Sequence, residues 1–228
     1  MPFGAEQWRR VFEDFGEVFG TGFLHTLEFS LLGLVLALCI GIILGVFSVS
    51  QLKILRVIAR VYVEFFQNTP LFLQLIFMYN VLPSVGIVLD VFPICVLGVG
   101  MYHGAYISEV VRTGIESVPK GQIEAAYSQG FNFFQTMVFI ILPQCYKAIV
   151  PAMLSQVITV IKDTSFLAQV AIEEFFNNSK WIMSAQIDST VNQSMRVFII
   201  FGFVALVYFI INFTLSCIVR NSRKKQEA

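Results

Sequence analysis

Long apolar runs separated by short charged stretches dominate this chain. A hydrocarbon core about 30 Å thick needs roughly 20 apolar residues in helical form. Four stretches without a charged residue approach or exceed that length: 29–52, 65–89, 91–108 and 197–219. A fifth span is placed near 144–161, in a region that Pro143 and Pro151 punctuate. The pattern therefore predicts an all-α membrane protein.

The expected spans, with their helix ends included, are about 24–50, 62–83, 91–113, 144–161 and 197–219. If 125–146 were another span, there would be six; we interpret it instead as a cytoplasmic helical segment. With five spans and the C-terminus inside, ten of the 15 Lys and Arg residues lie on the cytoplasmic side and five outside. The positive-inside rule therefore predicts an N-out, C-in topology.

Composition excludes the soluble classes. Of 228 residues, 57% are hydrophobic and 13% charged, and the mean hydropathy is +0.76. The formal net charge of zero offers no basic surface for nucleic acid. All four cysteines lie in apolar stretches without the paired spacing of a zinc site, so we expect buried thiols and no metal.

The chain divides into an extracytoplasmic segment (1–20), a membrane domain (21–219) and a basic cytoplasmic tail (220–228). The first 22 residues lack the basic start and short apolar run of a cleaved signal peptide, so the first span is expected to be retained.

Two spans carry small residues at every fourth position, which lets helix backbones approach closely in lipid. The first span has Gly33, Ala37, Gly41 and Gly45, and the third has Gly100, Gly104 and Ser108. The spacing predicts a packing face on each helix.

Residues 117–130, between the third and fourth spans, have the pattern of a short amphipathic helix. Pro119 suits the first turn, Ile123, Ala126 and Tyr127 share one face, and Gly130 can close the C-terminus. A structured cytoplasmic helix favours a docking surface; the alternative is a helix lying on the lipid headgroups.

A longer motif begins inside this helix. Glu124-Ala125-Ala126, Gly130, Ile140 and Leu142-Pro143 resemble, at seven fixed positions, the signature loop of permease subunits of binding-protein-dependent ABC importers. Three further segments are similar to the polar amino acid uptake branch: 62–71, 104–115 and 161–166. That branch usually has Arg where Gln67 stands and small polar residues near His103.

The resemblance implies a type I importer permease fold over 21–219 and a set of partners. These are two ATP-binding subunits, a second permease, identical or paralogous, and an extracytoplasmic amino-acid-binding protein, in a bacterial cytoplasmic membrane. The residues implied in ATPase coupling are Lys120, Glu124, Ala125, Ala126 and Gly130. The chain has no G-x-x-x-x-G-K-[ST] loop, so ATP and Mg²⁺ would be used by the partner.

A second candidate site follows from the cost of charge in lipid, roughly 2.5 to 3.5 kcal/mol on insertion scales. Lys162 and Asp163 are adjacent and do not face each other on a helix, so each needs another partner. An amino acid offers both an ammonium and a carboxylate. The predicted substrate pathway comprises Thr69, Gln156, Lys162, Asp163, Thr164 and Ser165.

Alternative interpretations remain open at this stage. Lys162 and Asp163 could lie at the outer interface and snorkel, and the Asn68-Thr69-Pro70 interruption could be a simple kink. His103 is interpreted as a hydrogen-bonded packing residue, and Glu109 with Arg112 as a structural ion pair.

The expected function is uptake of a polar amino acid, best glutamine or glutamate, because the pathway shows no acidic cluster for a cationic side chain. The alternatives are an ion-gradient-driven secondary transporter, an intramembrane enzyme, for which no catalytic residues are visible, and a structural subunit.

Overall fold

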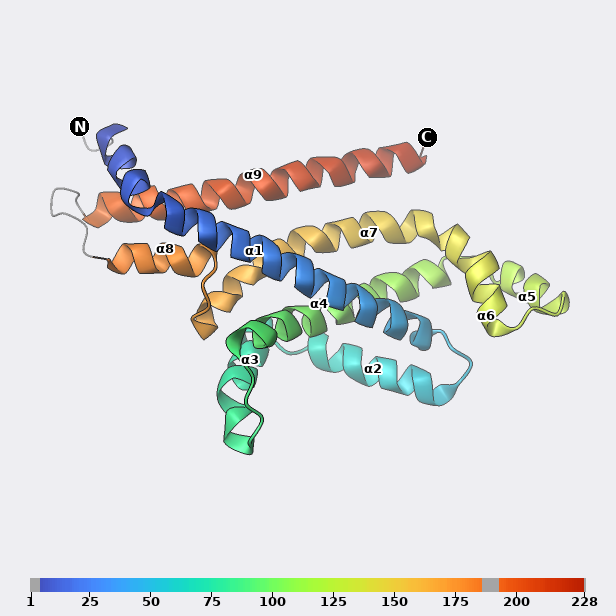
Figure 1. The fold of residues 1–228 in the computed structure, drawn as a ribbon. Helices are drawn as coiled ribbons and strands as arrows, with labels where there is room; N and C mark the ends of the chain where they lie inside the picture. The colour runs from blue at the N-terminus through green and yellow to red at the C-terminus, as the bar shows by residue number, and fades with distance from the viewer. Residues whose placement is uncertain (1–4, 186–192, 228) are drawn as a thin grey trace.

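The computed structural model describes residues 5–185 and 193–227, and every regular element in those ranges is helical. Residues 1–4 of the expected N-terminal segment lie outside the described part. The long helices α1 (Ala5–Ser48), α4 (Val91–Glu116), α7 (Leu142–Asp163) and α9 (Gln193–Glu227) extend along one common direction (Figure 1). The predicted all-α class is confirmed for the described residues.

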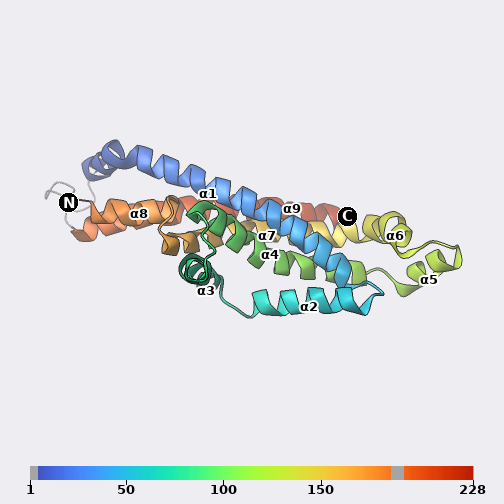
Figure 2. The same ribbon diagram turned by 60° about the horizontal axis from the view of Figure 1, so that its bottom comes forward.

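Helix α1 crosses α4, as Figure 2 shows from a second side, and small residues of both helices lie at the crossing. A Cβ atom on Gly45 would lie 2.5 Å from Val111 Cβ, and one on Gly100 would lie 2.5 Å from Leu36 Cδ2. These distances leave no room for a larger side chain. The packing faces predicted from the two small-residue ladders are confirmed, and they face each other.

Helix α1 begins earlier than the predicted span. Its first turns bury Val11 and Phe19 in a cluster with α8 (Phe175–Ser184) and α9, and this packing extends the helix beyond the lipid-length stretch. The expected boundary near residue 20 therefore falls inside a continuous helix, and the division into segments stays a prediction.

The predicted second span, 62–83, was wrong as a single helix. The chain there forms α2 (Lys53–Gln67), α3 (Leu71–Ile76), the π-helical turn η1 (Phe77–Val81) and a 3-10 turn η2 (Pro83–Val85). Pro70 has no N–H to continue the helix and disfavours helical geometry at Thr69, so α2 and α3 take different directions (Figure 1). The count of uncharged residues gave the length of the stretch, and the interruption noted at Asn68-Thr69-Pro70 ends the helix there.

The segment before α7 is helical, and the chain bends within the first turns of α7. It comprises α5 (Lys120–Ser128), α6 (Phe133–Gln135) and η3 (Thr136–Ile141), and the axis of 133–146 is bent by 66° from that of 148–170. Helix α7 covers the predicted fourth span, with ends two residues beyond it on either side. A 3-10 stretch, η4 (Thr164–Val170), follows.

Three helices among the described residues are long and apolar enough to cross a membrane, or four if the bent pair counts as one span. They contain the predicted spans three and five and all but the last two residues of span one, and the bent pair contains the fourth. The protein is thus a multi-helix membrane protein, while the number of five spans and the N-out, C-in orientation stay predictions.

Candidate functional site

The predicted docking helix forms as α5, directly after α4. It begins at Lys120, behind Pro119, whose extended backbone (φ −56°, ψ 133°) turns the chain into the helix. Lys120, Glu124 and Ala125 are exposed, whereas Ala126 is buried. The Glu124 carboxylate is therefore on the exposed face of the helix, and Ala126 is on the face that packs against the rest of the chain.

Gly130 ends α5 in the way its position predicted. Its φ of +86° is a left-handed conformation that other residues rarely adopt. The Phe131 N–H donates to Ala126 O at 3.1 Å and the Gly130 N–H donates to Tyr127 O at 3.0 Å, the two bonds of a Schellman motif. The Asn132 side chain then accepts from the Gln135 N–H and starts α6 with a capping box.

Two contacts fix α5 against the rest of the chain. Ile123 packs on the apolar cluster that contains Val118 and Met137. The Tyr127 hydroxyl accepts a hydrogen bond of 3.1 Å from Gln51 Nε2, in the turn between α1 and α2. The face of α5 around Glu124 is thus exposed but rigidly supported, as a docking surface requires.

The interruption at Asn68-Thr69-Pro70 is held by a small polar network. The Thr69 hydroxyl donates to Phe65 O at 2.8 Å and accepts from Gln74 Nε2 at 2.6 Å. Gln74 is largely buried, and its Nε2 also lies 3.1 Å from Thr69 O. The backbone groups that the proline frees are therefore satisfied within the protein, and α3 packs beside η4.

Asp163 finds its partner on α4. Its Oδ2 lies 3.4 Å from His103 Nε2; the Asp163 side chain is 22% exposed and that of His103 only 1%. Neither ring nitrogen of His103 makes a hydrogen bond with the described residues. The prediction that His103 packs with its ring hydrogen-bonded was therefore wrong in part. The ring is buried, but it faces a carboxylate and makes no hydrogen bond with the described residues.

His103 lies in the middle of its helix. His103 stands midway along the 26-residue helix α4, about 18 Å of helix from either end. An ionisable residue in the middle of a spanning helix marks a functional pathway by default. Both residues stand out in the sequence, but nothing there indicates that they pair, because they are 60 positions apart.

The other predicted pathway residues do not all meet at this point. Lys162 is exposed and, with Ser165, lines a separate pocket of about 760 Å³ between α7 and α9. Thr164 is fully buried and directly follows the last residue of α7. Its hydroxyl donates a hydrogen bond of 2.7 Å to Ile161 O. Gln156 is half-buried on α7, about two turns before Asp163. Lys162 and Asp163 thus diverge, as their adjacency predicted.

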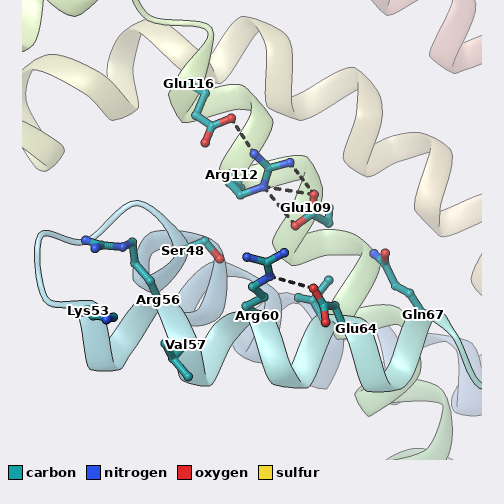
Figure 3. Close-up of a pocket in the computed structure, with 11 residues that line it drawn as sticks. Ser48, Lys53, Arg56, Val57, Arg60, Glu64, Gln67, Glu109, Arg112 and Glu116 are labelled. Carbon is teal, nitrogen blue, oxygen red and sulfur yellow. Dashed lines mark hydrogen bonds and ion pairs between the residues drawn. The ribbon is translucent and has the colours of Figure 1, made fainter.

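A charged cleft of about 660 Å³ opens between the end of α1, α2 and α4 (Figure 3). The Arg112 guanidinium lies 2.7 Å from Glu109 Oε2 and 2.6 Å from Glu116 Oε2. The predicted Glu109 and Arg112 ion pair is confirmed. On the facing helix, Arg60 Nε lies 2.7 Å from Glu64 Oε1.

Metal chemistry has no visible donor set. Within residues 5–185 and 193–227, no group of three or more His, Cys, Asp or Glu side chains converges on one point. Buried Cys95 and Cys145 and exposed Cys39 are all free thiols.

The chain is also similar to known proteins. Residues 37–227 match the family described as "Binding-protein-dependent transport system inner membrane component". The chain is 34% identical over 205 residues to the probable glutamine ABC transporter permease protein GlnP of Bacillus subtilis, an alignment that covers 90% of this chain and 92% of that protein. It is 33% identical over 213 residues to the glutamate transport system permease protein GluD of Corynebacterium glutamicum, covering 91% and 74%.

Solved structures share the architecture. The "crystal structure of an amino acid ABC transporter with histidines" superposes with a TM-score of 0.80 at 26% identity, covering 93% of this chain and 95% of that chain. The MetNI methionine ABC transporter, in an inward-facing form, gives a TM-score of 0.66 at 20% identity over 92% of this chain and 98% of that one, which shows the fold alone. The importer permease fold implied by the resemblance is confirmed.

Proposed function

The chain belongs to the family of binding-protein-dependent transport system inner membrane components, and we propose that it is the permease subunit of an ATP-driven importer that carries a polar amino acid, glutamine or glutamate, into the cytoplasm. Its relatives are permeases of ABC transporters, so the chain is a transport component and not an enzyme. The energy for transport comes from a separate ATPase.

Helix α5 is the observation that carries this proposal. Its Glu124 is exposed, its C-terminal turn depends on a left-handed Gly130, and the helical segment that follows it continues, through a 66° bend within α7, toward Asp163. A push on α5 is therefore transmitted along a bent helix to Asp163, at the far end of α7. This geometry supports a coupling role for Lys120, Glu124, Ala125, Ala126 and Gly130.

The assembly follows from that role. Two ATP-binding subunits dock on the α5 helices of this chain and of a second permease, identical or paralogous, and hydrolyse ATP with Mg²⁺. An extracytoplasmic binding protein delivers the amino acid on the opposite side. The N-out, C-in topology in a bacterial cytoplasmic membrane places α5 in the cytoplasm, next to the ATPases.

The middle of the membrane supplies the substrate contacts. Asp163 is available to a substrate ammonium because part of its side chain is exposed. The half-buried Thr69, at the break before α3, and the half-buried Gln156, within α7, add polar groups, and Lys162 with Ser165 offers a cation in the neighbouring pocket. Thr164 contributes by ending α7 next to Asp163.

Substrate preference follows from the charge of this region. His103 already faces Asp163, so the carboxylate does not stand alone as a partner for a cationic side chain. The relatives named for glutamine and glutamate support the same choice. A neutral or acidic polar amino acid therefore fits better than lysine or arginine.

The test is uptake of a panel of labelled amino acids by cells with and without this gene. We expect deletion to remove uptake of glutamine or glutamate and to leave lysine uptake unchanged. Unchanged uptake of every amino acid in the panel would contradict the proposal.

A further inference from the structure

Two cations in the first turn of α2 have no acidic partner. The cleft between α2 and α4 is lined by four cations and three glutamates: Lys53, Arg56, Arg60, Arg112, Glu64, Glu109 and Glu116. Arg60 pairs with Glu64, and Arg112 pairs with the other two glutamates. Within the part of the chain that the structure describes, Lys53 and Arg56 form no ion pair. The start of α2 therefore carries an unbalanced positive charge.

The Lys53 and Arg56 side chains are both exposed, and Figure 3 shows them at the same end of α2. Arg56 Nη1 donates to Ser50 O at 2.7 Å and to Gln51 O at 3.0 Å, in the turn between α1 and α2. These two bonds hold the guanidinium beside the turn and leave its Nε and Nη2 groups for a ligand. The two cations thus form one accessible positive surface on a single helical turn.

Another face of the same helix is apolar and uncovered. Four large side chains, spaced three or four positions apart, form a continuous stripe along it, which we call the α2 stripe: Ile54, Ile58, Val61 and Phe65. Each of them is about half exposed or more in the isolated chain, from 49% to 67%. The α2 stripe begins in the same turn that carries Lys53 and Arg56, so the apolar and the positive surfaces are adjacent.

The position of α2 beside α4 places the two cations at the depth of lipid headgroups. Gln67 Nε2, at the end of α2, donates to Ala105 O at 3.4 Å, two residues from His103 in the middle of α4. Lys53 and Arg56 precede Gln67 by 14 and 11 residues, or about 21 and 17 Å along the helix. The hydrocarbon core ends about 15 Å from the membrane centre, and the headgroups end at about 20–22 Å. The α2 stripe therefore lies beside acyl chains and the cations lie beside lipid phosphates.

This arrangement selects an anionic lipid. A lipid phosphate can accept hydrogen bonds from Lys53 and Arg56 while the acyl chains of the same molecule cover the α2 stripe. A free phosphate would leave the stripe uncovered. Phosphatidylcholine also has a phosphate, but its choline cancels the negative charge. Arg60 and Glu64 lie nearer the membrane centre and are paired with each other, as charges at that depth require.

We propose that the start of α2 is a binding site for an anionic phospholipid, whose phosphate contacts Lys53 and Arg56 and whose acyl chains lie along the α2 stripe. The site is independent of the transported amino acid and of the energy source. It also adjoins the support of α5, because Gln51, whose carbonyl accepts from Arg56, donates through its side chain to the Tyr127 hydroxyl. A bound lipid therefore contacts the turn that holds α5 in place.

Quenching of tryptophan fluorescence by brominated lipids tests this site on the full-length chain in vesicles. The two native tryptophans, Trp8 and Trp181, are replaced by phenylalanine, and a single reporter, Ile58→Trp, is placed on the α2 stripe. Ile43→Trp on α1 is the matched control. Ile43 and Ile58 are 53% and 49% exposed, and each lies five residues from the end of its helix at the same turn. The vesicles contain phosphatidylcholine and increasing amounts of brominated phosphatidylglycerol; brominated phosphatidylcholine gives the reference.

We expect phosphatidylglycerol to bind beside Ile58→Trp roughly 25-fold more tightly than phosphatidylcholine, about 5-fold for each cation. Beside Ile43→Trp the two lipids should bind about equally, and inorganic phosphate should displace neither. Equal preference at the two reporters would overturn the proposal. So would displacement by inorganic phosphate, which would identify a site for free phosphate, or no quenching of Ile58→Trp by either lipid, which would show that protein covers the stripe.

A second set of variants tests the contribution of charge. Lys53→Gln should lower the preference for phosphatidylglycerol at Ile58→Trp roughly 5-fold, whereas Lys53→Arg should keep it. Lys53 is chosen because Arg56 also holds the turn. Lys180→Gln removes an exposed cation from α8 and should change nothing. Circular dichroism checks that the chain remains helical. An unchanged preference in Lys53→Gln would show that the cations do not hold the lipid.

Discussion

Helix α5 and the His103 and Asp163 pair use polar residues in opposite ways. In α5 the carboxylate of Glu124, which we propose for ATPase coupling, is exposed, and the fold supports the helix through local hydrogen bonds within 119–135. In the membrane the carboxylate of Asp163 depends on a single ring from another helix, 60 positions away. The first site is built by local sequence and the second by tertiary packing alone.

The difference shows how each site tolerates change. An exposed residue on a supported helix can change without loss of fold, so substitutions there separate transport from stability. A buried charge that loses its partner costs several kcal/mol, so substitutions in the membrane affect both. Four sets of substitutions, in order of decreasing effect on uptake, test this contrast.

Glu124→Lys and Gly130→Pro should abolish uptake and leave the protein in the membrane. The first reverses a charge on the docking face. The second forces φ to about −65° at a position that needs +86° and removes the N–H that donates to Tyr127 O. Radiolabelled uptake and membrane immunoblots measure the two effects. Glu13→Lys, the same charge reversal at an exposed glutamate in the first turns of α1, is the control, and this variant should transport normally.

Asp163→Ala should lower uptake by about 100-fold and leave the ATPase bound, because the substrate loses its anionic partner while α5 is untouched. Asp163→Asn keeps the shape of the side chain without its charge and should behave the same way. Co-purification with the ATPase measures assembly. If both variants lose the ATPase as well as uptake, the pair is a structural ion pair.

Gly41→Val should destabilise the protein by about 1–3 kcal/mol through overpacking against α4. A Cβ on Gly41 would collide with Ile107 and would lie 3.0 Å from Gly104 O. Gly202→Val on α9 has nothing within 4 Å of the added carbon and should be neutral. Thermal unfolding of the purified permease compares the two, and equal midpoints would show that the close α1 and α4 crossing is not needed.

Glu174→Gln should affect uptake least, because this buried acid is structural. Glu174 caps α8, and burial raises its pKa to about 7. Since its pKa is higher in the folded state, the folded protein binds more protons between about pH 4.5 and 7, and its stability falls as pH rises through that window, by at most about 1.4 kcal/mol per unit. Thermal unfolding from pH 5 to 8 should show this fall of stability with pH in the native chain and a weaker fall in the variant. Equal slopes would show that a group other than Glu174 causes the pH dependence.

The contrast also explains what the sequence could predict. Three predictions were confirmed: helix α5, its end at Gly130, and the small-residue packing faces of α1 and α4. Each depends on residues within a few positions or on a periodic spacing. The same holds for α4, an uninterrupted apolar run, and for the ion pair of Glu109 and Arg112, three residues apart on one helix.

Predictions failed where distant segments decide the outcome. The span at 62–83 was counted by composition, but Pro70 breaks it and the packing of α3 beside η4 fixes its direction. The pairing of His103 with Asp163 depends on how α4 and α7 are placed against each other. The charged cleft is formed by α2 turning its polar face toward α4, which periodicity alone does not reveal.

The central claim is that ATP, acting through α5, drives uptake through this chain. Labelled glutamine uptake is measured in intact cells under ATP depletion with the ion gradient maintained, and separately with an ionophore while ATP stays high. Our account predicts that uptake stops on ATP depletion and continues with the ionophore. Uptake that stops with the ionophore while ATP remains high would contradict it and identify an ion-gradient-driven secondary transporter.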